Sequence, residues 1–398
     1  MPHRQILILD DDPSVGQTIQ WIAESLGFLA EYVTSPQDFF QRLVEMSPDF
    51  ITIDLVMPEL DGVEVMRLLA ERKCRAEIVI SSGMGTRVLE AAQRSATEHG
   101  LCIAGVISKP ISKDALRLVV GEGNKNNYSQ PAEKLSTTRT EYGITESELR
   151  NALDNHNFVV FYQPKIDCKS CVPAGFEALV RWQHLDRGLI DPDYFIPIAE
   201  ETGLIDALTE QIFDQSLAWF SQSFPRADLT LSLNLSAKSL VDLHLADSLS
   251  IFCRQYQIPH ERIVLELTET SAMVDPILSL DLLTRFRVKG FQLSIDDFGT
   301  GYSSMVQLVR LPFSEIKVDK SFVMDEQRSR EARTVIKSIV DLGHSLSLLV
   351  TAEGVEDPKT LTYLNSVGCD LAQGYCIARP MPGEAARCWV EEKLSLSI

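Results

Sequence analysis

Two adjacent aspartates, Asp296 and Asp297, follow an apolar run over residues 291–295 that is typical of a strand. Neighbouring strand side chains point to opposite faces, so both carboxylates can serve one site only where the strand ends. Gly299 and Gly301 predict that ending, because they let the chain turn sharply. Two such carboxylates repel each other unless a cation lies between them, and Mg2+ takes oxygen ligands of this kind. The pair therefore indicates either a cation site or an acidic turn between a strand and a helix.

Other strand-like runs in the same part of the chain also carry acids, amides or amines in apolar surroundings. An unpaired charge inside such a strand is destabilising, so each of these groups needs a partner or a ligand. A polar oxygen or amine from nearly every strand of one domain is typical of a barrel active site. The residues concerned are Glu177, Arg181, Asn234, Glu266, Glu269, Lys317, Asp319, Glu353 and Gln373.

The spacing of the apolar runs predicts how this domain is built. Thr145 and Glu148 have capping-box spacing, so we expect its first helix, and the domain 145–398, to begin there. Eight strands within about 250 residues fit a TIM-like (β/α)8 barrel. The expected strands lie near 158–165, 174–182, 229–236, 263–269, 292–297, 315–319, 348–353 and 370–376.

The type and order of these residues resemble the EAL family of cyclic-di-GMP phosphodiesterases. The resemblance covers roughly residues 146–398. It implies hydrolysis of one phosphodiester bond of cyclic di-GMP to give linear pGpG, with divalent metals as cofactors. The motifs that carry it are Glu177-Ala178-Leu179, Asn234, Glu266, Asp296-Asp297-Phe298-Gly299-Thr300-Gly301, Lys317 and Glu353.

The resemblance implies two Mg2+ or Mn2+ ions in the barrel. Two such ions can share a carboxylate and activate water for in-line attack on phosphorus. The second ion would engage Asp296 and Asp297. The ligands implied for the first ion are Glu177, Asn234, Glu266 and Asp296.

Lys317 and Glu353 are expected to act in the reaction, alongside the metal ligand Glu177. Lys317 either positions or deprotonates the attacking water, or stabilises the developing charge. Glu353 is either a contact of the second metal or a general base, and the sequence leaves both roles open.

A further set of residues is expected to contact the substrate. Arg181 presents a planar fork that suits a phosphate oxygen. Gln163 and Gln373 would offer amide contacts to the substrate or to metal-bound water. Asp319 is grouped with them, with support behind these contacts as its favoured role, and a satisfied internal hydrogen bond is the alternative for each of the three. Glu269 is expected to brace the loop that follows the paired aspartates.

The first 120 residues alternate short apolar strands with helices, which predicts a doubly wound, flavodoxin-like parallel sheet. Ligands in such sheets bind at the carboxyl ends of the strands. Five polar residues fall at these ends: Asp10, Asp11, Asp54, Ser82 and Lys109.

Together the five resemble a response-regulator receiver domain over residues 1–121. By that resemblance Asp54 accepts a phosphoryl group, and Asp10 and Asp11 help to hold one Mg2+ beside it. A carboxylate nucleophile would attack phosphorus while the metal offsets the accumulating charge.

Three further positions complete the expected receiver site. Lys109 and a hydroxyl contact the phosphoryl oxygens by the same resemblance. The hydroxyl is Ser82, or Ser81 if the strand ends one residue earlier. Val106 stands three residues before Lys109, where many receivers carry an aromatic residue, so the usual aromatic switch is in doubt.

Composition limits the remaining function classes. The chain has 398 residues, 56 acidic against 37 basic, and a formal net charge of −19. This balance argues against nucleic-acid or anionic-membrane binding, so we expect neither. An anionic substrate would then require bound cations, with Arg181 and Lys317, to reverse the charge locally.

Cysteine usage and apolar content indicate a cytoplasmic protein. No apolar segment approaches the roughly 18 residues of a membrane helix. The eight cysteines are scattered, which favours reduced thiols. Cys168 and Cys171 have CxxC spacing, but no second pair completes a zinc site.

These observations favour a two-domain response regulator, with residues 122–144 as a polar linker. The receiver would control the phosphodiesterase, through a cognate histidine kinase or phosphotransfer protein. The resemblance also implies a homo-oligomer formed through the EAL domains. The alternative hypothesis is a non-enzymatic cyclic-di-GMP receptor that signals through a partner.

Overall fold

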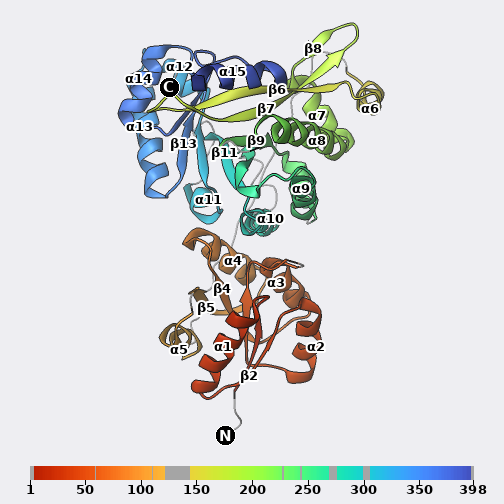
Figure 1. Ribbon diagram of the computed structural model, residues 1–398, viewed down its shortest axis with the longest axis vertical. Coiled ribbons are helices and arrows are strands. Elements are labelled where there is room, and N and C mark those ends of the chain that lie inside the picture. The colour runs from red at the N-terminus through yellow and green to blue at the C-terminus, as the bar shows by residue number, and fades with distance from the viewer. Residues whose placement is uncertain are drawn as a thin grey trace. The chain divides into compact units, whose positions relative to one another are not determined.

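The computed structural model of the chain describes residues 4–58, 60–109, 111–121, 144–225, 228–242, 244–268, 276–298 and 305–395 (Figure 1). The chain divides into two compact units, each described here by itself. One comprises Met1–Ser136 and Leu280–Lys289, the other Thr137–Ser279 and Gly290–Ile398. None of the helices within the described ranges has the length and apolar character required to cross a membrane.

A parallel five-stranded sheet, in the order β2-β1-β3-β4-β5, forms the centre of the first unit. Helices alternate with the strands along the chain, so the predicted doubly wound fold is confirmed. Its strands are β1 (Gln5–Leu9), β2 (Leu29–Val33), β3 (Phe50–Asp54), β4 (Glu77–Ser82) and β5 (Cys102–Ser108). Its helices are α1 (Pro13–Ser25), α2 (Pro36–Met46), α3 (Gly62–Glu71), α4 (Thr86–Glu98) and α5 (Lys113–Gly121).

Capping residues fix where the first helices begin. Asp12 accepts a hydrogen bond from the Ser14 amide at 2.8 Å, and a proline starts α1 directly after it. Ser35 caps α2 in the same way, again before a proline. A cap of this kind stabilises a helix by about 1 kcal/mol. Strand β2 was not predicted, because as an edge strand none of its residues is fully buried and its apolar signal is weak.

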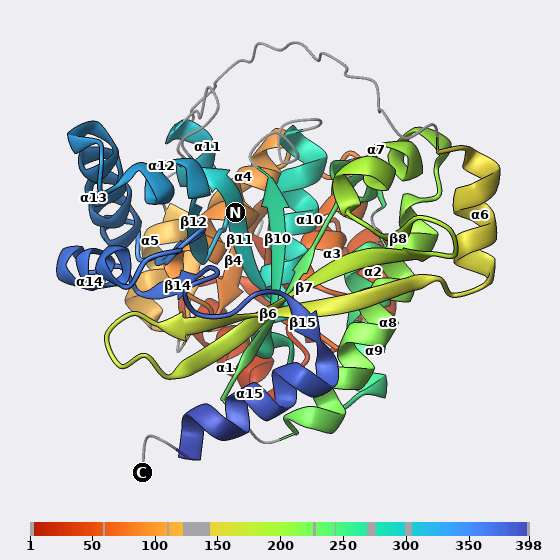
Figure 2. The same ribbon diagram turned by 90° about the horizontal axis from the view of Figure 1, so that it is seen from above.

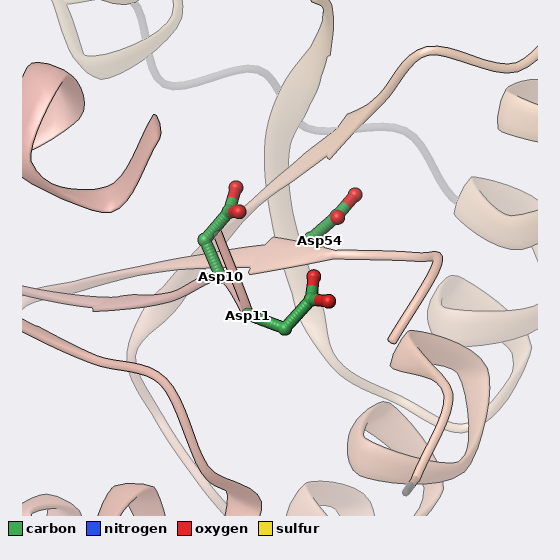
Figure 3. A group of neighbouring side chains, drawn as sticks. All are labelled: Asp10, Asp11 and Asp54. Atoms are coloured by element: carbon green, nitrogen blue, oxygen red, sulfur yellow. The ribbon is translucent and has the colours of Figure 1, made fainter. Parts of the chain in front are cut away.

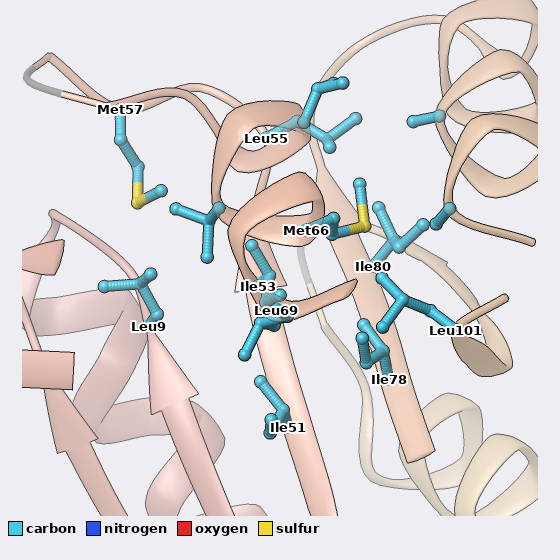
Figure 4. Close-up of a cluster of buried hydrophobic side chains, with 14 of the residues drawn as sticks. Leu9, Ile51, Ile53, Leu55, Met57, Met66, Leu69, Ile78, Ile80 and Leu101 are labelled. Atoms are coloured by element: carbon cyan, nitrogen blue, oxygen red, sulfur yellow. The ribbon is translucent and has the colours of Figure 1, made fainter. Parts of the chain in front are cut away.

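Apolar side chains fill both faces of this sheet. One cluster joins the strands to α2, α3 and α4, and Figure 4 shows part of it, with Ile51, Ile53, Ile78 and Ile80 from adjacent strands. The opposite cluster joins the alternate strand residues to α1 and α5. Each fully buried aliphatic side chain contributes about 1.5–3 kcal/mol, so the sheet is held rigidly.

Eight described strands close into a ring in the second unit. Their order is β6-β14-β13-β12-β11-β10-β9-β7, and β7 pairs with β6 to close the barrel. The predicted TIM-like barrel is therefore confirmed. The ring consists of β6 (Phe158–Asp167), β7 (Pro173–His184), β9 (Thr230–Asn234), β10 (Ile263–Thr268), β11 (Gln292–Phe298), β12 (Glu315–Val318), β13 (Leu349–Ala352) and β14 (Leu371–Gln373).

One strand of the ring runs against the others. β6 is antiparallel to both of its neighbours, β7 and β14. The reversal arises because β6 and β7 are joined by a tight turn, in which Asp167 accepts hydrogen bonds from the Ser170 amide and hydroxyl. Figure 2 shows this long hairpin with α15 beside it. The barrel thus departs from the all-parallel arrangement that the (β/α)8 prediction implies.

The remaining elements of this part of the chain alternate with the ring strands or extend them, and most of α10 (Pro276–Val288) belongs to the first unit. Strands β8 (Gly188–Ile190) and β15 (Met381–Pro382) pair with β7 and β6. Thr145 and Glu148 form the predicted capping box at the start of α6. The helices are α6 (Glu146–Asp154), α7 (Pro192–Thr202), α8 (Ile205–Ser223), η1 (Ala237–Val241), α9 (Leu245–Gln255), η2 (His260–Arg262), α10 (Pro276–Val288), α11 (Met305–Arg310), α12 (Lys320–Asp325), α13 (Arg330–Ser345), α14 (Pro358–Val367) and α15 (Gly383–Ser395).

Candidate functional site

The paired aspartates lie at an irregularity of β11. The strand continues through both acids to Phe298, but its pairing with β12 shifts register between Ile295 and Phe298. Asp297 adopts a positive φ of 56°, which is uncommon outside glycine. A bulge of this kind re-aims side chains, so neighbouring carboxylates can share a site within a strand. β11 ends at Phe298, directly before Gly299 as predicted, but the bulge within the strand is what re-aims the two carboxylates; Gly299 and Gly301 lie outside the described residues.

Lys317 lies at the centre of the acidic side chains of the barrel. Its Nζ lies 2.6 Å from Glu266 Oε2 and 2.5 Å from Glu353 Oε1, and it is fully buried. The same nitrogen is 3.3 Å from Asp296 Oδ1 and 3.6 Å from Glu177 Oε2. Four strands therefore direct carboxylates at a single ammonium group, as the sequence predicted for a barrel site.

The positive charge of one lysine does not balance the carboxylates of this cluster. Burial, opposed by Lys317, raises the pKa of Glu353 to about 8. Burial likewise raises the pKa of Glu177, and burial together with the charge of Asp296 raises that of Asp297. Raised carboxyl pKa values mean that the cluster lacks positive charge.

Glu177 is held in place by two amides. Asn234 Nδ2 donates to its Oε1 at 3.0 Å, and Gln373 Nε2 donates to its Oε2 at 2.6 Å. Gln373 Nε2 also donates to Gln163 Oε1 at 3.0 Å, and Gln163 donates to the carbonyl of Ala378. The two glutamines thus have the internal hydrogen bonds that were the alternative to substrate contact. Asn234 uses its side-chain nitrogen for this contact.

The arrangement fits divalent cations. Oxygen atoms of Asp296, Asp297 and Glu353 all lie within 4.8 Å of one another. Carboxylate and amide oxygens are the ligands that Mg2+ and Mn2+ prefer. Bound cations would supply the positive charge that the raised pKa values indicate is missing.

The structure adds a buried lysine that the sequence analysis missed. Lys165 on β6 donates to Glu266 Oε1 and to Ser232 Oγ, both at 2.7 Å, and lies 3.6 Å from Glu315 Oε1. Burial alone would raise the pKa of Glu266, but Lys165 and Lys317 outweigh it and lower that pKa. The signal was available in the sequence, since a lysine in the apolar run of β6 needs a partner as much as a glutamate does.

Two other predicted substrate contacts, Arg181 and Asp319, have an ion-pair partner or a capping role within the chain. Arg181 Nε pairs with Asp191 at 3.1 Å, where α7 begins. Asp319 caps α12 by accepting from the Ser321 amide at 2.9 Å. Glu269, the predicted brace, lies outside the described residues.

The receiver sheet brings its five predicted residues to one edge. Figure 3 shows Asp10, Asp11 and Asp54 beside one another, and their oxygens lie within 4.8 Å. Lys109 Nζ bridges Asp10 Oδ2 at 2.8 Å and Asp54 Oδ2 at 2.9 Å. Gly62 is required near this edge, because a Cβ there would lie 2.4 Å from the Asp54 carbonyl oxygen.

Electrostatics at this edge parallel those of the barrel. Burial raises the pKa of Asp10 and of Asp54, with Lys109 opposing both shifts. Ser82 Oγ accepts from the Met84 amide at 3.1 Å, whereas Ser81 Oγ donates to the carbonyl of Ile53 at 3.3 Å. Both serines are fully buried at the end of β4.

Comparison with known families agrees with the two units. Residues 146–380 match the EAL domain, and residues 6–120 match the response regulator receiver domain. Cyclic di-GMP phosphodiesterase RocR of Pseudomonas aeruginosa is 32% identical over 336 residues, which cover 84% of each chain. The bifunctional diguanylate cyclase/cyclic di-GMP phosphodiesterase MucR of the same species is 34% identical, but the match covers only 44% of its length.

Solved structures show the same barrel. The P. aeruginosa MucR phosphodiesterase in complex with c-di-GMP superposes with a TM-score of 0.58 at 38% identity, over 60% of this chain and 98% of that one. The EAL enzyme Bd1971, bound to cAMP and cyclic-di-GMP, gives 0.59 at 29% identity, over 62% of this chain and 68% of that one. The chain therefore belongs to the EAL domain family and carries a response regulator receiver domain before its EAL barrel.

Proposed function

We propose that this protein is a two-component response regulator whose barrel hydrolyses cyclic di-GMP to linear pGpG under control of receiver phosphorylation. The observation that carries the proposal is the convergence of four carboxylates on Lys317 in the barrel. Every position of the family's metal and lysine motif is filled, which favours an enzyme over a receptor that only binds the nucleotide.

Two Mg2+ or Mn2+ ions would bind at this cluster. Asp296 and Asp297 would hold the second ion, and Glu353 offers a carboxylate oxygen within 4.8 Å of theirs. When bound, the ions supply Lewis acidity and lower the pKa of water for attack on phosphorus. The residues that would hold the first ion are Glu177, Asn234, Glu266 and Asp296.

The chain's own groups then orient the reactants and move the proton. Glu353 would either contact the second ion or, in its ionised form, take a proton from the attacking water. Lys317 Nζ lies 2.5 Å from Glu353 and is a fixed positive charge in a buried site. It would stabilise negative charge that develops on the phosphoryl oxygens.

Substrate recognition would fall to groups at the rim of the barrel. Arg181 would exchange part of its pairing with Asp191 for a phosphate oxygen, since a guanidinium fork suits that ligand. Three further residues would support the groups that contact the substrate, because each already has an internal hydrogen bond. They are Gln163, Gln373 and Asp319.

In the receiver, Asp54 would accept the phosphoryl group from a cognate histidine kinase or phosphotransfer protein. Asp10 and Asp11 would hold one Mg2+ with Asp54, and Lys109 would contact the phosphoryl oxygens. Ser82 is the better candidate for the receiver hydroxyl, because Ser81 already donates to the carbonyl of Ile53.

Control of the barrel is proposed to act through residues 298–304, the loop expected from the sequence, of which 299–304 lie outside the described residues. Asp297 holds a strained backbone with φ of 56°, so a shift of that loop would move its carboxylate. Glu269 would brace the loop, and association through the EAL domains would transmit the receiver state. The domain limits proposed are 1–121, 122–144 and 145–398, for a protein acting in the cytoplasm.

The test is turnover of cyclic di-GMP by the full chain with Mg2+ or Mn2+, with and without a small phosphodonor. We expect pGpG as the product and a changed rate after phosphorylation. Asp54→Asn should remove both the phosphoryl label and the rate change. Tight nucleotide binding without turnover under either metal would overturn the enzyme in favour of a receptor.

A further inference from the structure

A second polar layer lies inside the barrel, directly beneath the candidate metal ligands. Residues two apart on a strand share a face, so a residue two positions before a site residue lies one layer deeper. On four strands of the barrel that deeper residue is polar and buried. The four pairs, deeper residue first, are Ser232 and Asn234, Ser294 and Asp296, Glu315 and Lys317, and Thr351 and Glu353.

The reversed strand β6 brings a lysine into this layer. Because β6 runs antiparallel, Lys165 reaches it two positions after Gln163 and not before it. Lys165 is 1% exposed, so its ammonium group has no access to bulk water. A buried ammonium group needs partners that repay its desolvation.

Glu266 is the principal partner of Lys165. The Nζ to Oε1 distance is 2.7 Å, whereas Glu315 Oε1 is 3.6 Å away. Glu315 Oε1 has its own donor in Thr351 Oγ1 at 2.8 Å. Lys165 is therefore hydrogen-bonded to Glu266 and only electrostatically paired with Glu315.

Because of the hydrogen bond from Lys165, the two carboxylate oxygens of Glu266 face different layers. Oε1 is bound to Lys165 below, and Oε2 points to Lys317 Nζ at 2.6 Å within the carboxylate cluster. Only Oε2 is directed at the place where Glu177 and Asp296 also converge. A carboxylate held in this way offers one oxygen in a fixed direction.

We propose that Lys165 is a positioning residue that holds Glu266 as a one-oxygen metal ligand, a role that rests on the proposed two-metal function. Groups that orient metal ligands typically change metal affinity by about 10–100-fold when they are removed. Lys165 lies in the deeper layer, where it also donates to Ser232 Oγ at 2.7 Å, and it would act on the metal through Glu266.

Lys165 could act on the metal site through its charge or by orienting Glu266. These two roles predict opposite changes in metal affinity for Lys165→Met. If Lys165 acted only as a charge, its removal would leave the site more negative and strengthen cation binding. If it orients Glu266, the released carboxylate loses its fixed direction and cation binding weakens. The sign of the change in metal affinity therefore separates the two roles.

A matched double variant removes the charge difference. Lys165→Met with Glu315→Gln deletes one positive and one negative group, so the net charge of the layer equals that of the unmodified protein. Glu315→Gln alone keeps the Lys165–Glu266 hydrogen bond and serves as the control. The double variant also avoids a buried, unpaired Glu315, so it carries the test even where Lys165→Met alone fails to fold.

The experiment measures Mn2+ binding to the full-length chain by calorimetry without nucleotide, together with thermal unfolding without metal. We expect the double variant to bind Mn2+ at least about tenfold more weakly than the charge-matched unmodified protein, and more weakly than Glu315→Gln, although all three unfold at similar temperatures. Equal Mn2+ affinity in the double variant and the unmodified protein, or stronger binding by Lys165→Met, would overturn the proposal. Failure of the unmodified protein to hydrolyse cyclic di-GMP would instead overturn the proposed function, and leaves this binding comparison intact.

Discussion

The receiver and the barrel each place a lysine among acidic side chains, but they do so in different surroundings. Lys109 bridges two aspartates at the edge of an open sheet, and its side chain is 21% exposed. Lys317 meets four carboxylates inside a closed ring, and its side chain is 0% exposed. The same chemical pairing therefore occurs once at a surface and once in a core.

The difference follows from the two sheets. An open sheet offers only its strand ends, so the receiver residues form one layer and Asp11 remains exposed. A closed ring turns alternate residues of every strand inward, so the barrel holds a second polar layer beneath the first. An edge site suits a phosphoryl group that arrives and leaves, while a layered interior can hold ligands in fixed directions.

Removal of divalent metal is expected to have the largest effect on activity. It should affect the barrel site and the receiver site alike, so it distinguishes them least. EDTA should abolish cyclic di-GMP turnover, and Mg2+ or Mn2+ should restore it, because the barrel carboxylates need positive charge to face an anionic substrate. Ca2+ should restore it poorly, since it tolerates irregular geometry and is larger. The measurement is pGpG release by chromatography, and full turnover by metal-stripped protein would contradict the two-metal site.

The buried carboxylate cluster of the barrel should tolerate substitutions far less well than the partly exposed receiver site. Lys317→Ala and Glu353→Gln should each lower turnover by at least about a hundredfold while nucleotide binding stays detectable, as expected of groups that act in the transition state. Single-turnover rates and binding isotherms with Mn2+ provide the measurement. A loss of binding in proportion to the loss of rate would show instead that these residues only hold the substrate.

The periodicity of the sequence predicted most of the fold, since all eight ring strands begin within one residue of the expected position. It missed what depends on pairing between distant strands. The bulge that turns Asp296 and Asp297 into one site is visible only in the register with β12.

Lys165 is a second feature that depends on pairing between distant strands. Its alternation with Gln163 places both on one face, but only the reversed direction of β6 shows that the lysine lies in the deeper layer. The contact with Glu266 joins residues 101 positions apart, and no local pattern reports such a distance. Motif residues were therefore predictable, while the pairing of Lys165 with Glu266 was not.

The pH dependence of stability should distinguish the metal-free barrel from the loaded one. Folding raises the pKa of Glu353 to about 8, so the folded state binds a proton that the unfolded chain releases near pH 4.3. This contribution is present at low pH and is lost as the pH rises toward about 8, so metal-free stability should fall across that interval. Stabilisation by Mg2+ should grow over the same interval, because the ligands must be deprotonated.

Urea unfolding at a series of pH values, with and without Mg2+, measures this. Glu353→Gln should flatten the metal-free profile, since the neutral amide has no proton to lose. A metal-free profile that rises between pH 5 and 8 would show that Glu353 is ionised in the folded protein.

The smallest expected effect concerns the two receiver serines and tests the edge site alone. Ser82 Oγ accepts from the Met84 amide beyond the strand end, whereas Ser81 Oγ donates to the carbonyl of Ile53 within the sheet. Ser82→Ala should therefore slow labelling of Asp54 by a small phosphodonor about three- to tenfold, because one hydrogen bond to a phosphoryl oxygen is worth about 1 kcal/mol. Ser81→Ala is the matched control, and should change stability more than labelling. The reverse order of labelling rates would assign the receiver hydroxyl to Ser81.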